Sequence, residues 1–194
     1  TPHELGHNLG LPHADGLHGG AEVIPVSGGI STERGDPFDR MGSSFDFYHF
    51  NAAHKDRLQW FSPDQLHNIV GQSGTVTLTP FETSEPGLKV IKILRDVDQF
   101  GSRSWYYLEY RQPIGFDKGL ETDPLNLNIT EGVLVHLGFE NGQGSQLLDM
   151  TPEDTDCPSC VFQNAALTAD QTFTDPTRGI RITPIRVIGD SVTV

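Results

Sequence analysis

Three histidines near the start of the chain have the spacing of ligands to one catalytic metal ion. His3 and His7 form the pattern H-E-x-x-H, and His13 follows three residues after Gly10. On a helix, residues i and i+4 lie on one face about 6 Å apart along the axis, so both imidazoles reach the same ion. Three neutral imidazoles leave a fourth tetrahedral position for water, which is typical of a catalytic zinc site.

Glu4 adjoins the first histidine and is the candidate general base. Its carboxylate projects towards a zinc-activated water without itself binding the metal, and it can accept that water's proton. Gly10 permits a backbone turn with positive φ, which redirects the chain and brings His13 back to the ion. The chance of the whole pattern arising from this composition is on the order of one in ten thousand. We therefore predict a zinc-dependent metalloendopeptidase with one catalytic Zn²⁺.

A short helix and the segments after it must position these side chains. The helix is predicted from about Pro2 to Leu9, because Pro suits the first turn and Gly10 ends the pattern. Residues 14–40 are predicted to be an irregular loop rich in Gly and Asp. Apolar spacing predicts a helix over 50–61, and a further short helix is predicted over 62–66.

Beyond residue 70 the sequence changes to short alternating segments separated by Gly, Pro and Asp. Such segments are typical of an antiparallel β-sandwich. The predicted fold class is therefore α+β, with one domain at 1–70 and a β-sandwich domain at 71–194. The strands are expected at 75–79, 90–94, 105–110, 132–137, 146–149, 180–187 and 191–194.

The composition restricts the kind of partner. The chain of 194 residues has a formal net charge of −13. Nucleic acids and anionic membranes are therefore unsuitable partners, because both require a basic surface. No apolar run approaches the roughly 18 residues of a transmembrane helix. The oligomeric state is not indicated.

The two cysteines, Cys157 and Cys160, form a single C-x-x-C. A zinc ribbon would need a second such pair, and a thioredoxin-like site would need a βαβ context, whereas the flanking residues favour a loop. The favoured interpretation is a short-range disulfide in an oxidising compartment, with free thiols as the alternative.

Several other polar residues are weaker candidates. Asp15 follows the third histidine and is either a hydrogen-bond acceptor for an imidazole or a solvated turn residue. Calcium is a further candidate ion for the loop, although no EF-hand pattern supports it. The acidic residues considered as calcium ligands are Asp36, Asp39 and Asp46. The histidines without ligand spacing are interpreted as surface or packing residues: His18, His49, His54, His67 and His136.

The extended histidine motif followed by a Met-turn is the signature of metzincin peptidases, and the chain resembles their gametolysin type. Met41, 28 residues beyond His13, is the Met-turn candidate, with plain core filling as its alternative. The resemblance implies a secreted endopeptidase that acts on a protein or glycoprotein. It also implies the C-terminal half of a metzincin catalytic domain (active-site helix, Met-turn, helix) followed by the β-sandwich. The matching segments are HELGHNLGLPHA, DRMG, FNAAHKDRLQW, YYLEYRQPIGFD, GVLVHL, LLDMTP and QTFTDPTRGIRI.

Two features depart from other metzincins. Astacin-like and serralysin-like enzymes place a Tyr two residues after the Met, whereas this chain has Ser43, so no zinc-contacting tyrosine is assigned, and Tyr48 is an unsupported substitute. The metzincin sheet whose edge strand binds substrate would precede Thr1. We therefore expect the chain to belong to a longer secreted precursor, and expect activity to require the complete protein.

A non-enzymatic function is the alternative. The chain would then be a β-sandwich module for adhesion or carbohydrate binding that keeps a vestigial zinc site. A decayed peptidase usually loses the Glu or one of the histidines, but His3, Glu4, His7 and His13 are all intact. The intact set favours the enzyme.

Overall fold

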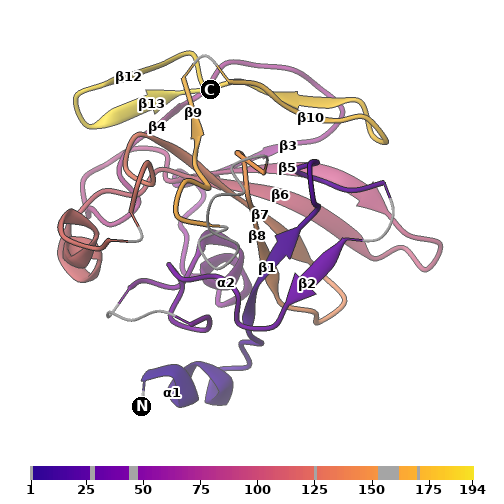
Figure 1. Cartoon of the computed structure of the whole chain (residues 1–194), viewed down its shortest axis with the longest axis horizontal. Helices are drawn as coiled ribbons and strands as arrows, with labels where there is room; N and C mark the ends of the chain where they lie inside the picture. The colour runs from indigo at the N-terminus through magenta and orange to yellow at the C-terminus, as the bar shows by residue number, and fades with distance from the viewer. Residues whose placement is uncertain (1, 27–28, 44–47, 125, 153–161, 170) are drawn as a thin grey trace.

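The protein is a mixed α+β structure made mostly of sheet, with few helices (Figure 1), which confirms the predicted class. The computed structural model describes residues 2–26, 29–43, 48–124, 126–152, 162–169 and 171–194. The predicted Cys157–Cys160 disulfide lies outside these residues. The helices are α1 (Pro2–Asn8), α2 (Ala52–Arg57) and the 3₁₀ helix η1 (Gly115–Glu121).

The strands of the described residues form one large sheet and two small ones. The large sheet has the order β2-β1-β8-β7-β6-β5-β3, with β9 paired to β7, and the small sheets are β10-β11 and β12-β13-β4. The strands are β1 (Ala14–His18), β2 (Ile30–Thr32), β3 (Leu66–Ile69), β4 (Thr77–Leu78), β5 (Val90–Val97), β6 (Arg103–Glu109), β7 (Gly132–Phe139), β8 (Ser145–Leu148), β9 (Leu167–Thr168), β10 (Phe173–Asp175), β11 (Ile180–Ile182), β12 (Arg186–Ile188) and β13 (Ser191–Thr193).

Strands from both sides of residue 70 share the large sheet. β1 pairs in parallel with β8, and β3 pairs in parallel with β5, whereas the strand pairs formed within 71–194 are antiparallel. The prediction of an irregular loop over 14–40 is wrong at β1 and β2. β1 pairs with the nearby β2 and also with β8, which lies more than a hundred residues away, and the short segments of β1 and β2 carry no clear apolar alternation. The division into domains at residue 70 stays a prediction.

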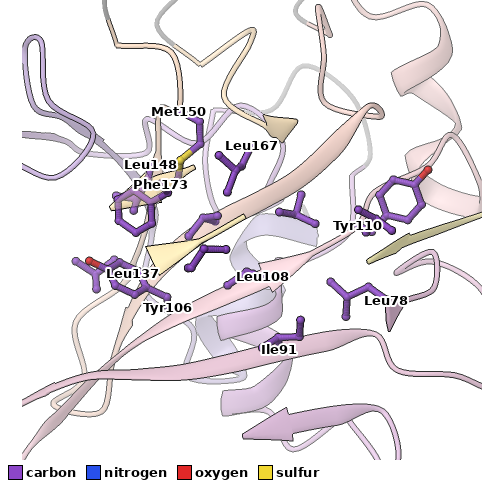
Figure 2. Close-up of a cluster of buried hydrophobic side chains, with 14 of the residues drawn as sticks. Leu78, Ile91, Tyr106, Leu108, Tyr110, Leu137, Leu148, Met150, Leu167 and Phe173 are labelled. Atoms are coloured by element: carbon purple, nitrogen blue, oxygen red, sulfur yellow. The ribbon is translucent and has the colours of Figure 1, made fainter. Parts of the chain in front are cut away.

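The two faces of the large sheet pack against different layers. On β6, Tyr106 and Leu108 join the core between the large sheet and the small sheets (Figure 2). Trp105 and Tyr107, which alternate with them, pack on the opposite face with Ala52 of α2. This period of two is that of a strand buried on both faces. α2 therefore lies on the side of the sheet away from the small sheets.

The helix predictions are partly confirmed. α1 agrees with the predicted Pro2–Leu9 to within one residue. α2 is shorter than predicted, because Asn51 caps its start by accepting the His54 N–H and Gln59 has φ +58° just beyond its end. The helix predicted over 62–66 is wrong. Residues 63–65 form a turn, and Leu66 begins β3, whose pairing with β5 outweighs the local capping signal.

The buried Arg111 connects the start of α2 with the large sheet through a cluster of hydrogen bonds. Arg111 contacts the carboxyl groups of Glu109 at 2.9 Å, Asp117 at 2.5 Å and Glu82 at 3.1 Å. Its guanidinium also donates to the carbonyl of Phe38 at 3.3 Å, in the loop after β2. Glu109 in turn accepts the N–H of Ala52 at 2.5 Å, so one cluster holds both the loop and α2.

No helix among the described residues combines the length and the apolar character that crossing a membrane would require.

The titration of Glu82 in the Arg111 cluster predicts that the stability of the fold falls as pH rises from 6.5 to 8. Burial, followed by the hydrogen bond with Asp117, raises the pKa of Glu82 from 4.5 to about 9. The folded state therefore binds more protons than the unfolded state between these values, so stability falls as pH rises. Burial lowers the pKa of His49 from 6.5 to about 4, and this opposes the fall in stability below pH 6.5. Burial also lowers the pKa of Lys55 from 10.5 to about 8, and this opposes the fall in stability above pH 8.

The clearest window is therefore pH 6.5 to 8, where the stability of the wild type should fall by up to about 1.4 kcal/mol per pH unit from this group. Glu82→Gln removes the titrating group and should flatten the slope. Urea unfolding of both proteins across the window measures the difference. Equal slopes would show that Glu82 is already ionised in the folded protein.

Candidate metal centre

The three histidines of the motif come together at one end of the molecule. The ring centroids of His3 and His7 are 4.8 Å apart, and His13 lies 5.4 Å from the first and 4.9 Å from the second. One ring nitrogen from each lies within 4.8 Å of the others, which makes the three a possible ligand set for one ion. Two of the rings come from α1, and the third comes from the segment between α1 and β1.

Each ring is oriented by a hydrogen bond from its Nδ1. His3 donates to the carbonyl of Arg40 at 3.0 Å, and His7 donates to the carbonyl of Leu11 at 2.9 Å. The Nδ1 of His13 lies 3.0 Å from a carboxylate oxygen of Glu33. Because carbonyl oxygens only accept, the first two Nδ1 atoms carry the proton, and the carboxylate favours the same tautomer in His13. A neutral imidazole protonated at Nδ1 offers the lone pair of Nε2 to a metal ion.

Gly10 makes the turn that the sequence predicts. Its φ is +85°, in the left-handed region that a residue with a side chain rarely adopts. The N–H of Leu11 then donates to the carbonyl of Gly6 at 3.0 Å, which folds the chain back against α1. The turn therefore both ends the helix and supplies the carbonyl that holds His7.

Met41 packs against the buried face of α1. Its side chain is fully buried, and a methyl group placed on Gly6 would come within 2.3 Å of the Met41 sulfur and 3.3 Å of the Phe50 ring. Gly6 is the buried residue of α1 and stands between the two histidines of the helix. The absence of a side chain there allows the methionine to approach the helix backbone.

Glu4 occupies the first turn of α1 and is exposed to solvent. His7 is exposed as well, so the centre is accessible to water. Glu4 follows His3 directly in the chain and is not a member of the group of three histidines that the structure brings together. This arrangement suits a proton acceptor beside the ion.

Glu33 is an outer partner that the sequence did not indicate. It lies one residue beyond β2 and contacts His13, whereas the sequence candidate Asp15 accepts the backbone N–H of Arg34 at 2.8 Å. Asp15 thus holds the residue next to Glu33 and acts on the imidazole only indirectly. The pairing joins residues twenty apart in the chain, so no spacing rule could have identified it.

The other candidate residues have structural partners. Tyr48 is buried and donates to the Asp123 carboxylate. Asp36 pairs with His136 at 2.9 Å, and Asp39 pairs with His54 at 3.2 Å. Because N–H donors occupy these carboxylates, the observed contacts favour a structural role over calcium binding. Of the remaining loop residues, Asp46 lies outside the described part of the chain and Ser43 is exposed.

Comparisons of the chain with protein-family models, curated proteins and solved structures find no match. The assignment of the three histidines as a candidate metal site therefore rests on their geometry in this structure. The gametolysin-type resemblance of the sequence stays a prediction.

The contact between Gly6 and Met41 predicts a coupling between two substitutions. Gly→Ala in a helix interior is favourable by about 1 kcal/mol, whereas overpacking a core position costs about 1–3 kcal/mol. Gly6→Ala should therefore be neutral or destabilising in the wild type, but stabilising by up to about 1 kcal/mol when Met41→Ala has removed the sulfur. Unfolding free energies of the four proteins in urea give the coupling energy. If the two substitutions changed the free energy of unfolding additively, Met41 would not support the helix at Gly6.

Proposed function

We propose that the protein is a zinc-dependent metalloendopeptidase. The observation that carries the proposal is the convergence of three imidazoles, each held through Nδ1 so that Nε2 is available to one ion. Imidazole nitrogen is a preferred zinc ligand, so the donor set fits this metal. The exposed Glu4 beside the ligands supplies the acid–base group that hydrolysis requires.

The ligand set favours a catalytic over a structural ion. Among the described residues, the group contains three histidines and no further His, Cys, Asp or Glu. Structural zinc sites have four protein ligands, whereas catalytic sites have three and leave one position open. When bound, zinc in such a site lowers the pKa of its water towards about 7 and polarises the scissile carbonyl.

The residues of the chain have separate roles in this reaction. His3, His7 and His13 would hold the ion through Nε2, because each ring is oriented by an oxygen acceptor at Nδ1. Glu4 accepts a proton from the attacking water and transfers it to the leaving amine. Met41 packs against Gly6 and so supports the helix that carries His3 and His7.

We further propose that the peptidase is a secreted metzincin of the gametolysin type that acts on an extracellular protein or glycoprotein. This part of the proposal is supported by the sequence resemblance. It is also supported by the contact of Met41 with Gly6, between His3 and His7, because the Met-turn methionine of these enzymes packs beneath the three imidazoles. Residues 1–70 would then be the C-terminal part of a metzincin catalytic domain, and residues 71–194 would be the β-sandwich domain that follows it.

Two substitutions separate metal binding from catalysis. Glu4→Gln should leave zinc binding intact and reduce casein hydrolysis by the complete protein by about 100- to 10,000-fold, because the general base is lost. His7→Ala should lose both the zinc and the activity. Zinc is measured per chain by titration with a chromophoric chelator, and hydrolysis is measured with and without excess chelator.

His67→Ala is the matched control, because His67 is an exposed histidine on β3, away from the centre. His67→Ala should change neither the zinc bound per chain nor the rate of casein hydrolysis. Full hydrolysis by Glu4→Gln would remove that residue from its role. Zinc binding without any chelator-sensitive hydrolysis would favour the adhesion or carbohydrate-binding alternative.

A further inference from the structure

The loop from Asp36 to Ser43 connects the candidate ligands to the interior. Its Arg40 carbonyl accepts the Nδ1 proton of His3, and its Met41 side chain lies beneath Gly6 of α1. The carbonyl of Met41 also accepts the N–H of Ala14, the residue after His13, at 3.1 Å. Two of the three ligand positions are therefore set by consecutive residues of this loop.

One buried carboxylate fixes these two residues. The Asp39 side chain is fully buried, and its Oδ1 accepts the N–H of Met41 at 2.5 Å. Its Oδ2 accepts the N–H of Asn51 at 2.5 Å and contacts Nδ1 of His54 at 3.2 Å. The Asp39 carbonyl accepts the N–H of Gly42 at 3.0 Å, which closes a turn with Arg40 and Met41 at its centre. The carboxylate thus determines where the Arg40 carbonyl points.

His54 contributes to this arrangement through one nitrogen. It is buried in α2, and its Nε2 makes no hydrogen bond to the described residues. The Nδ1 proton is therefore the group through which the ring acts on Asp39. Burial of the pair keeps water from competing for the carboxylate, so the turn has a single set of donors.

We propose that Asp39, held by His54, is a positioning residue of the metal centre, acting through the Arg40 carbonyl on His3 and through Met41 on α1. The inference depends on the metal centre of the proposed function and adds to it the residues that set its ligand geometry. A residue with only a general stabilising role would affect folding without a specific effect on metal affinity.

The test compares two buried aspartates by their effect on zinc affinity. Asp39→Asn places an amide N–H where backbone N–H donors point, so the turn should reorganise. We expect zinc affinity to fall by about 10- to 100-fold, the usual effect of losing an outer partner. Asp175→Asn is the control, because Asp175 is equally buried and hydrogen-bonded to Tyr106 and Arg95, but lies in β10 behind the large sheet. Its affinity should equal that of the wild type.

Affinity is measured by competition with a chromophoric chelator at a temperature where circular dichroism shows each variant to be folded. The visible absorption of bound Co²⁺ provides a second readout, because its intensity reports the coordination geometry. A folded Asp39→Asn variant with wild-type affinity and spectrum would overturn the proposal. An equal loss of affinity in Asp175→Asn would also overturn it, since the effect would then be one of general stability.

A second pair of variants decides the question if Asp39→Asn does not fold. His54→Asn keeps an N–H near the position of Nδ1 and should retain zinc affinity, whereas His54→Phe removes it and should weaken binding about 10- to 100-fold. Equal affinity of the two variants would contradict the role of Asp39. Zinc binding by the wild type without peptide hydrolysis would refute only the proposed function. Absence of zinc binding by the wild type would refute both proposals.

Discussion

The centre depends on the contact between a short exposed helix and the loop beneath it. α1 has seven residues, and Gly6 is the one that it buries. An isolated helix shorter than about 12–15 residues is marginal in water, so α1 does not hold its own geometry. The contact of Met41 with Gly6 and the hydrogen bond from His3 to Arg40 therefore have to fix the helix.

The loop is itself fixed by polar groups that come from the folded interior. Asp36 pairs with His136 of β7, and Asp39 pairs with His54 of α2, all four side chains being buried. The guanidinium of Arg111 holds the carbonyl of Phe38 between them. Buried pairs of this kind require well-defined partners, because an unpaired charge in the interior is strongly unfavourable. The loop therefore has one conformation that satisfies its carboxylates, and the ligand positions follow from it.

The sequence predicted the parts of the centre that local geometry determines. The spacing of the three histidines and the left-handed turn at Gly10 follow from helix periodicity and backbone sterics, and the structure has both. Glu33, His54 and His136 were not identified as partners, because their contacts join separate elements and leave no periodic signal. The same reason explains the errors in secondary structure. β1 joins the large sheet through the distant β8 and β3 joins it through β5, and local composition, which carries no trace of these pairings, indicated a loop and a helix instead.

The outer partners of the three imidazoles differ in strength, which affects how the ion would behave. Three neutral rings leave the ion its full double charge, unlike thiolate or carboxylate ligands, and this favours the polarisation of a bound carbonyl. Arg40 and Leu11 supply neutral backbone carbonyls, whereas Glu33 supplies a carboxylate at His13. The Glu33 side chain is 78% exposed, so solvent screens much of that charge. The positive charge of a bound ion would therefore be little reduced by the protein, which agrees with the proposed catalytic role.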